Sequence, residues 1–102
     1  MNVLFLGCSS FTGFHFVDKL SKNKNIKIYC TLQKNISSYK NNREIRIRNL
    51  KKKKNIILLT KIKFGDEKFI KLLNKLNFKY ICFHHAYTKF YNNNKKFNFM
   101  FI

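Results

Sequence analysis

Gly7, Ser10 and Gly13 have the spacing of a phosphate-binding loop near the N-terminus. They follow a short apolar run, residues 3–6, and overlap the start of a segment with helical periodicity. A dinucleotide-binding fingerprint has glycine at all three positions, between a strand and a helix whose N-terminal amides bind the pyrophosphate. The spacing therefore predicts a phosphate loop in which serine occupies the middle position.

The sequence also contains residue types that bind metals or act as nucleophiles. His84 and His85 are adjacent at the end of an apolar run, but a metal site needs further ligands, and acidic residues and cysteines are sparse nearby. The cysteines Cys8, Cys30 and Cys82 are odd in number, lack Cys-x-x-Cys spacing and lie in or beside apolar runs. We therefore predict no metal site, and free buried thiols in a cytoplasmic protein.

The elements that must position these residues follow from the apolar pattern. Short runs rich in apolar or β-branched residues predict strands at residues 3–6, 26–32, 56–59 and 80–83. The first run shows no alternation of apolar with polar residues, which is typical of a strand buried on both faces of a parallel sheet.

Between the strands, apolar residues recur at helical spacing. They are Phe14, Val17 and Leu20 in the first segment, Ile47 and Leu50 in the second, and Phe69, Leu72, Leu73 and Leu76 in the third. The second segment, residues 39–54, is basic, and the third follows Asp66, which is a favourable N-cap residue. A helix is therefore predicted between each pair of consecutive strands.

The resulting order, β-α-β-α-β-α-β, implies parallel strands joined by right-handed crossovers. We therefore predict an α/β protein with a partial Rossmann-like, doubly wound parallel sheet between two layers of helices, a three-layer α/β/α arrangement. Residues 1–87 form this predicted segment. Residues 88–102 are Asn/Lys-rich and then apolar, and we interpret them as a C-terminal tail belonging to a truncated next element.

The charge of the chain is strongly positive, with 22 basic and 4 acidic residues and a net charge of +18. Such a charge is typical of proteins that bind nucleic acids or anionic surfaces. The abundant Lys, Asn, Ile, Phe and Tyr residues all have A/T-rich codons, however, and a bias toward these codons explains much of the charge without a polyanionic partner. Since no apolar window approaches the roughly 20 residues of a membrane-spanning helix, we expect no membrane partner.

At this point the sequence resembles a known family. The segment LFLGCSSFTGFHFVDKL, residues 4–20, is similar to the opening of the extended short-chain dehydrogenase/reductases, the NAD(P)-dependent epimerases and dehydratases that act mainly on nucleotide sugars. Two later segments continue the resemblance in register: FGDEKF, residues 64–69, and KYICFHHAY, residues 79–87. The resemblance covers roughly residues 1–92 and implies the N-terminal, cofactor-binding part of such an enzyme.

The resemblance also implies which residues bind the cofactor. Those that match the family pattern around the pyrophosphate are Gly7, Ser9, Ser10, Phe11, Thr12 and Gly13. Ala86 matches the small residue after the fourth strand, beside the ribose and nicotinamide. At the middle position, the Ser10 hydroxyl is expected to be tolerated because it is able to donate to a phosphate oxygen.

The end of the second strand departs from the pattern of NAD-preferring members, which have a carboxylate there for the ribose 2′-hydroxyl. This sequence has no acid at that place, and a cation suits a 2′-phosphate instead. Lys34 is the residue we expect to bind it, with Arg43 as a second candidate, so NADP is favoured over NAD as cofactor. Lys63 similarly replaces the aspartate that contacts adenine in the family.

Reductases of this superfamily use a Tyr-x-x-x-Lys pair as the catalytic base. The spacing occurs here at Tyr91 and Lys95, but it follows the fourth strand too closely and encloses three asparagines, which are poor helix residues. We interpret the pair as a polar loop and assign no catalytic residue. The chain alone is therefore expected to be inactive, with the dinucleotide as ligand and with a complementing polypeptide or a second copy of the chain as a partner.

A small basic nucleic-acid-binding module is the alternative interpretation. Residues 34–54 and 87–96 interleave basic and aromatic side chains, which is a pattern that binds single strands. No zinc-finger, RNP-like or KH-like motif accompanies the pattern, and codon bias produces the same interleaving. We therefore expect only non-specific attraction of nucleic acid by the positive charge.

Overall fold

The computed structural model describes residues 1–83 and 99–101. These residues form a parallel sheet whose strands lie in the order β3-β2-β1-β4-β5. The strands are β1 (Asn2–Leu6), β2 (Lys27–Thr31), β3 (Ile56–Leu59), β4 (Tyr80–Phe83) and β5 (Phe99–Phe101). Because the chain leaves β3 at one edge and returns to β4 beside β1, the sheet has the reversal of strand order that defines a doubly wound fold.

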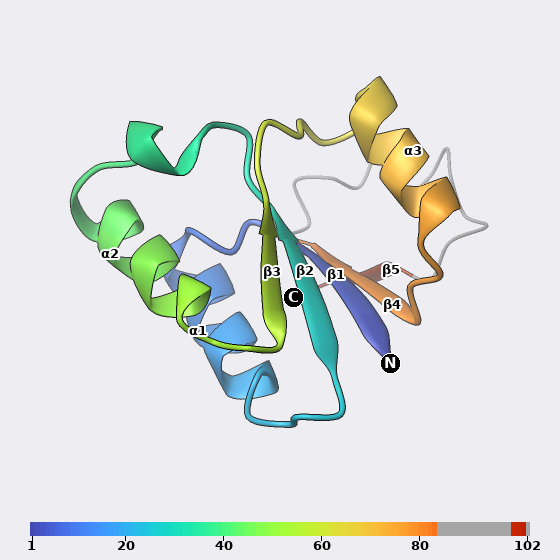
Figure 1. Cartoon of the computed structure of the whole chain (residues 1–102), viewed down its shortest axis with the longest axis horizontal. Helices are drawn as coiled ribbons and strands as arrows, with labels where there is room; N and C mark the ends of the chain where they lie inside the picture. The colour runs from blue at the N-terminus through green and yellow to red at the C-terminus, as the bar shows by residue number, and fades with distance from the viewer. Residues whose placement is uncertain (84–98, 102) are drawn as a thin grey trace.

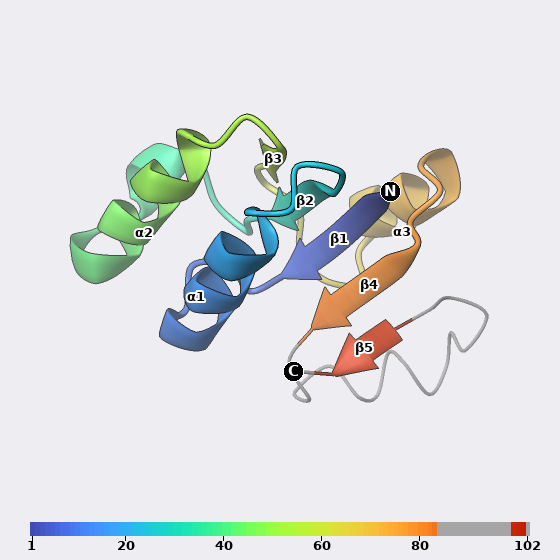
Figure 2. The ribbon, with the colours of Figure 1, turned by 90° about the horizontal axis from the view of Figure 1, so that it is seen from below.

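Two layers of helices enclose the sheet (Figures 1 and 2). Helices α1 (Phe11–Leu20) and α2 (Asn41–Lys51) cover one face, and α3 (Glu67–Lys75) covers the other. A single 3₁₀ turn, η1 (Ile36–Ser38), lies between β2 and α2. The predicted α/β class and doubly wound arrangement are therefore confirmed. The basic helix is shorter than the predicted 39–54, since it begins after Lys40 and ends at Lys51.

Strand β1 contributes to a core on each face of the sheet. Val3 and Phe5 pack with the side chains of α1 and α2, whereas Leu4 and Leu6 pack with those of α3. All of these side chains are at most 3% exposed. The unbroken apolar run therefore indicated correctly a strand covered on both faces.

The helices complete these two cores through the predicted apolar residues. Val17 of α1 and Ile47 and Leu50 of α2 are fully buried on one face, and Phe69 and Leu73 of α3 are buried on the other. Apolar side chains of α1 and α2 thus cover one face of the sheet, and those of α3 cover the other. No helix in the described part of the chain is long and apolar enough to cross a membrane.

Candidate functional site

The turn between β1 and α1 depends on Gly7. Its φ angle is +89°, a conformation that residues with a side chain adopt only with strain. Among residues 1–83 and 99–101, no atom lies within 4 Å of a Cβ atom built on Gly7. On the side where a Cβ atom would lie, no described residue therefore prevents a ligand from approaching the Gly7 backbone closely.

Gly13 has a different role, which is close packing of the helix onto the end of the strand. A Cβ atom at Gly13 would collide with the carbonyl oxygen of Gly7 and lie 2.9 Å from the carbonyl carbon and from Ser10 Oγ. The first turn of α1 is consequently as near to the end of β1 as the backbone allows. The first and third positions of the motif thus require glycine for separate physical reasons.

Ser10, at the middle position, is the N-cap of α1. Its Oγ accepts a hydrogen bond from the Gly13 amide at 3.0 Å and donates one to the Gly7 carbonyl oxygen at 3.0 Å. The hydroxyl that was expected to be available to a phosphate is therefore engaged within the loop. The first backbone amides of a helix lack intrahelical acceptors, and those of Phe11 and Thr12 have no acceptor among the described residues.

The loop opens onto a cavity of about 390 Å³ at the carboxyl ends of the strands. Gly7 and Ser9 form one side of it, and Lys34 and Arg43 also line it. The structure thus brings together the phosphate loop and both cations that were expected to bind a 2′-phosphate. Parallel α/β sheets bind ligands at this edge, beside the point where the strand order reverses.

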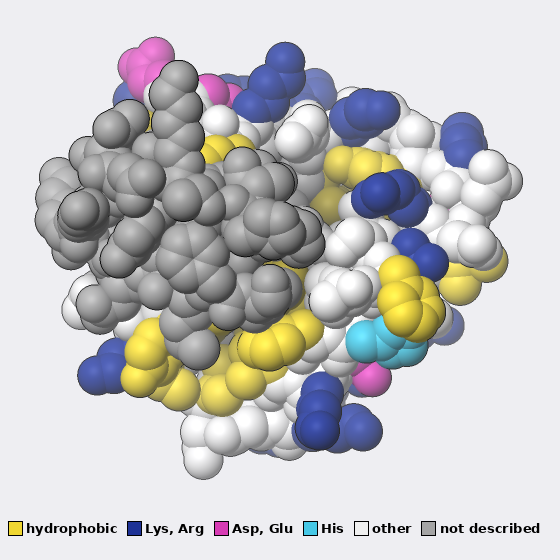
Figure 3. Space-filling view, turned by 180° about the vertical axis from the view of Figure 1, so that it is seen from behind, with side chains coloured by type: hydrophobic (Ala, Val, Ile, Leu, Met, Phe, Trp, Pro, Cys, Tyr) yellow, Lys and Arg dark blue, Asp and Glu magenta, His cyan; other side chains and the backbone are white. Residues whose placement is uncertain are grey.

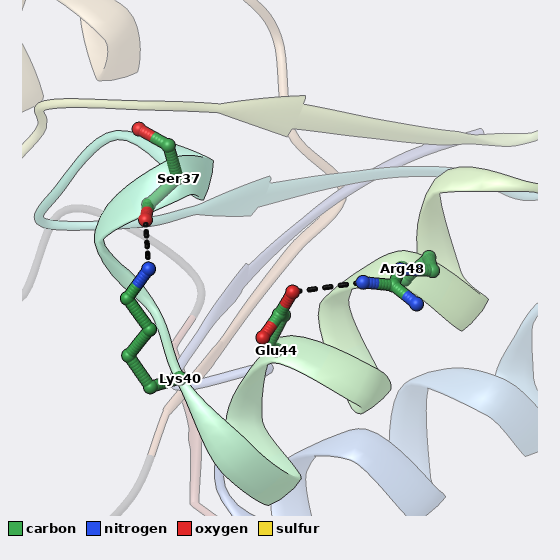
Figure 4. Close-up of polar contacts among 4 residues, drawn as sticks. All are labelled: Ser37, Lys40, Glu44 and Arg48. Carbon is green, nitrogen blue, oxygen red and sulfur yellow. Dashed lines mark hydrogen bonds and ion pairs between the residues drawn. The ribbon is translucent and has the colours of Figure 1, made fainter.

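Further lining residues come from the segment that leads into α2, and sequence reasoning missed them. Tyr39 and Lys40 line the cavity, and the Tyr39 hydroxyl accepts a hydrogen bond from the Lys34 backbone amide at 3.3 Å. The Lys40 ammonium donates to the Ser37 carbonyl at 3.1 Å (Figure 4). The only available signal was their position just before a basic helix, which does not fix the direction of the side chains.

The described residues that line the cavity include no aspartate or glutamate. The acidic residue of α2, Glu44, pairs instead with Arg48 one turn further along the helix, at 2.8 Å (Figure 4). The cavity wall therefore carries positive charges from Lys34, Lys40 and Arg43, and this charge favours an anionic ligand.

Two arginines of α2 hold the phosphate loop through Ser9. Arg43 Nη1 donates to Ser9 Oγ at 2.8 Å, and Arg46 Nη1 donates to the Ser9 carbonyl oxygen at 3.1 Å. The Arg46 guanidinium also lies 5.6 Å from the centroid of the Phe11 ring. Sequence reasoning did not identify Arg46, although its spacing of three residues from Arg43 places both on one side of a helix.

The thiols of Cys8, Cys30 and Cys82 are free and buried, as predicted. A hydrogen bond with Cys8, together with burial, raises the pKa of the Cys30 thiol well above its usual range. Burial raises the pKa of the Cys82 thiol to about 11. These two thiols are therefore protonated at neutral pH and are poor nucleophiles.

No group of His, Cys, Asp or Glu in residues 1–83 and 99–101 is arranged to bind a metal ion. Several of the residues named in the sequence analysis lie outside the described residues. They are His84, His85, Ala86, Tyr91 and Lys95.

No protein-family model and no curated protein matches the chain. Solved structures do match it. The chain is similar to the UDP-glucuronic acid 4-epimerase of Bacillus cereus in complex with NAD, with a TM-score of 0.65 and 17% identity. A variant of the same enzyme in complex with NAD and UDP-4-deoxy-4-fluoro-glucuronic acid gives a TM-score of 0.66 and 17% identity.

Each of these similarities covers 81% of this chain and 26% of the epimerase chain. The chain therefore spans about a quarter of the length of the enzymes that it resembles. The expected resemblance to NAD-dependent epimerases is confirmed at the level of the fold.

Proposed function

We propose that this chain is the NAD(P)-binding segment of an oxidoreductase of the nucleotide-sugar epimerase/dehydratase type. The observation that carries the proposal is the loop between β1 and α1, which opens onto a cationic cavity at the carboxyl ends of the parallel strands. A bare glycine backbone beside the start of a helix is what the close approach of a pyrophosphate requires.

In this proposal, the loop binds one part of the dinucleotide and the cavity binds another. The amides of Phe11 and Thr12, which have no acceptor in the described part of the chain, bind the pyrophosphate. The Gly7 backbone admits it because no described residue lies within 4 Å of a Cβ atom built there. The cavity lined by Lys34, Tyr39 and Arg43 takes the adenosine end. These residues fit such a ligand because they combine cations with a partly buried aromatic ring beside a backbone that a phosphate is able to approach.

We propose NADP rather than NAD as the preferred cofactor. A ribose 2′-phosphate is matched by Lys34 and Arg43, and no carboxylate among the described lining residues would repel it. One donor of Arg43 is used by Ser9 Oγ, and a guanidinium has five N–H donors, so others remain for a phosphate. The structural relatives were solved with NAD, so this preference rests on the residues of this chain.

In an enzyme of this type, a bound nicotinamide cofactor would supply reversible hydride transfer with a sugar carbon, for epimerisation or for the elimination of water. We propose that the catalytic tyrosine and lysine come from outside these 102 residues. This fits the quarter-length coverage of the structural relatives. A complementing polypeptide that carries this pair would then complete the active site.

Fluorescence titration with NADPH and NADH tests the proposal. We expect NADPH to bind more tightly than NADH, and Gly7→Asp to abolish binding because it places a side chain and a negative charge in the open space. Lys34→Gln is expected to weaken NADPH binding by about tenfold while changing NADH binding little, as for a lost charge-assisted hydrogen bond. Lys24→Gln, on the distant loop before β2, is the matched control for charge.

The proposal fails if neither dinucleotide binds at high protein concentration. In that case a nucleic-acid titration at several salt concentrations decides the alternative. Tight binding with a steep dependence on salt would favour a nucleic-acid-binding module. Weak binding that disappears at moderate salt would be the generic effect of a charge of +18. Turnover of a nucleotide sugar by the 102-residue chain alone would overturn the proposal that catalytic residues come from elsewhere.

A further inference from the structure

The two arginines that hold Ser9 differ in what else they are able to reach. They lie one turn apart on α2 and donate to different atoms of the same residue. The described residues that line the cavity include Arg43 but not Arg46. Arg43 is thus exposed to a ligand in the cavity, whereas Arg46 contacts Ser9 of the loop and Phe11 at the start of α1.

The contacts of Arg46 fix the orientation of one peptide unit. In a trans peptide the carbonyl and the N–H point in opposite directions. Holding the Ser9 carbonyl oxygen toward α2 therefore keeps the Ser10 N–H turned the other way, toward the Gly7 carbonyl, to which it donates at 3.4 Å. This peptide unit immediately precedes the Ser10 side chain that caps α1.

The second contact of Arg46 holds the start of α1 itself. Its guanidinium lies against the ring of Phe11, the first residue of the helix. The same ring meets the His15 ring edge to face, with the centroids 4.5 Å apart. Phe11 is 65% exposed, so these contacts rather than core packing determine where it lies. Figure 3 shows a histidine beside an exposed hydrophobic side chain, with basic side chains close by.

We propose that Arg46 is a positioning residue for the phosphate loop. It holds the loop in the conformation that presents the first backbone amides of α1 to the pyrophosphate, and Arg46 itself does not contact the ligand. The inference rests on the proposed function and deepens it, because it assigns the two arginines to different parts of the ligand. Arg43 acts on the 2′-phosphate in the cavity, and Arg46 acts through the backbone on the pyrophosphate.

Two ligands separate these roles in a calorimetric titration. NADPH contains both the pyrophosphate and the 2′-phosphate, whereas adenosine 2′-monophosphate contains only the latter. We expect Arg46→Met to raise the Kd for NADPH by about tenfold and to leave the Kd for adenosine 2′-monophosphate within about twofold of the wild type. Arg43→Met is expected to raise both. Lys51→Met removes the same charge from the exposed end of α2 and should change neither.

Rescue by a conservative variant distinguishes positioning from general damage to α2. Arg46→Lys keeps a cation that is able to donate to the Ser9 carbonyl, and we expect it to restore the Kd for NADPH to within about threefold of the wild type. Equal weakening of both ligands by Arg46→Met, or no weakening of NADPH, would overturn the assignment.

Amide hydrogen exchange tests the loop without a ligand. We expect Arg46→Met to speed exchange of the Gly13 amide, which donates to Ser10 Oγ, and to leave the amides of α3 unchanged. Unchanged exchange at Gly13 would refute the positioning role even if the chain bound no dinucleotide. Failure of the proposed function is separate, because it would appear as absence of NADPH binding by the wild type.

Discussion

Replacing Gly13 with alanine tests the close approach of α1 to β1. The added methyl group would overlap the Gly7 carbonyl, which is backbone and is not able to rotate away as a flexible side chain would. Overpacking of this kind destabilises a protein by about 1–3 kcal/mol, and the rigid obstacle places Gly13→Ala at the upper end. Alanine favours a helix over glycine by about 1 kcal/mol, which leaves a net loss of about 2 kcal/mol.

For a domain of this size, each kcal/mol shifts the midpoint of thermal unfolding by roughly 4–8 °C. Gly13→Ala is therefore expected to lower Tm by about 8–16 °C, as measured by circular dichroism. The neighbouring Thr12→Ala is the matched control, since Thr12 is exposed and its replacement should change stability by no more than about 0.5 kcal/mol.

The same variant is expected to lose affinity for NADPH, because the methyl group pushes the first turn of α1 away from the strand. If Gly13→Ala unfolds at the same temperature as Thr12→Ala, the packing argument is refuted. If it is destabilised but binds NADPH like the wild type, then the free amides at the start of α1 are not part of the binding site.

Three further predictions concern the pH dependence of α3, the thiols and the core. The pKa of Asp66 is lowered chiefly because its carboxylate accepts a hydrogen bond from the Phe69 amide. The carboxylate therefore contributes to stability above its unfolded pKa of about 3.9, and this contribution is lost as the pH falls through the lower folded pKa. Urea unfolding midpoints measured across this pH range should depend less on pH in Asp66→Asn than in the wild type, and an unchanged dependence would contradict the prediction. Cys30 and Cys82 should react with a thiol reagent at pH 8 only after denaturant is added, since both are buried and protonated, and rapid labelling of the native protein would argue against this packing. Ile47→Ala should lower the free energy of unfolding by about 2–5 kcal/mol in urea titrations, because the side chain is fully buried; a change as small as that of an exposed residue would mean that α2 does not pack as described.

Much of the fold was predictable because its cause is local in the sequence. The strands β3 and β4 begin and end at the predicted residues, because each is a short apolar run bounded by polar residues. The start of α3 was equally clear, since Asp66 Oδ1 accepts from the Phe69 amide at 2.8 Å as an N-cap does. The helical limits of α2 were less predictable because basic residues continue beyond Lys51 without changing helix propensity.

The site was predictable only in part, because its geometry depends on how distant elements pack. The glycine spacing and the lack of an acid after β2 are visible in the sequence. The contact of Arg46 with Ser9 joins residues 37 positions apart, and it exists only because α1 and α2 lie side by side. The hydrogen bond from the Ser10 hydroxyl to the Gly7 carbonyl oxygen was also not predicted. The spacing of Gly7, Ser10 and Gly13 does not show whether this hydroxyl donates to the backbone or to a phosphate oxygen.

The position of β1 in the sheet also has a consequence for the order of folding. Val3 pairs on one side with Ile28 and on the other with Tyr80, so its two neighbours become available at very different stages of synthesis. Contacts between residues distant in sequence form slowly because a long loop must close first. The β1-α1-β2 unit, with its phosphate loop, is therefore able to assemble early on the ribosome. One edge of β1 remains unpaired until β4 has been synthesised. Until then that apolar edge is an open template for pairing with another chain, and a nascent chain that stalls before Tyr80 would be prone to aggregate.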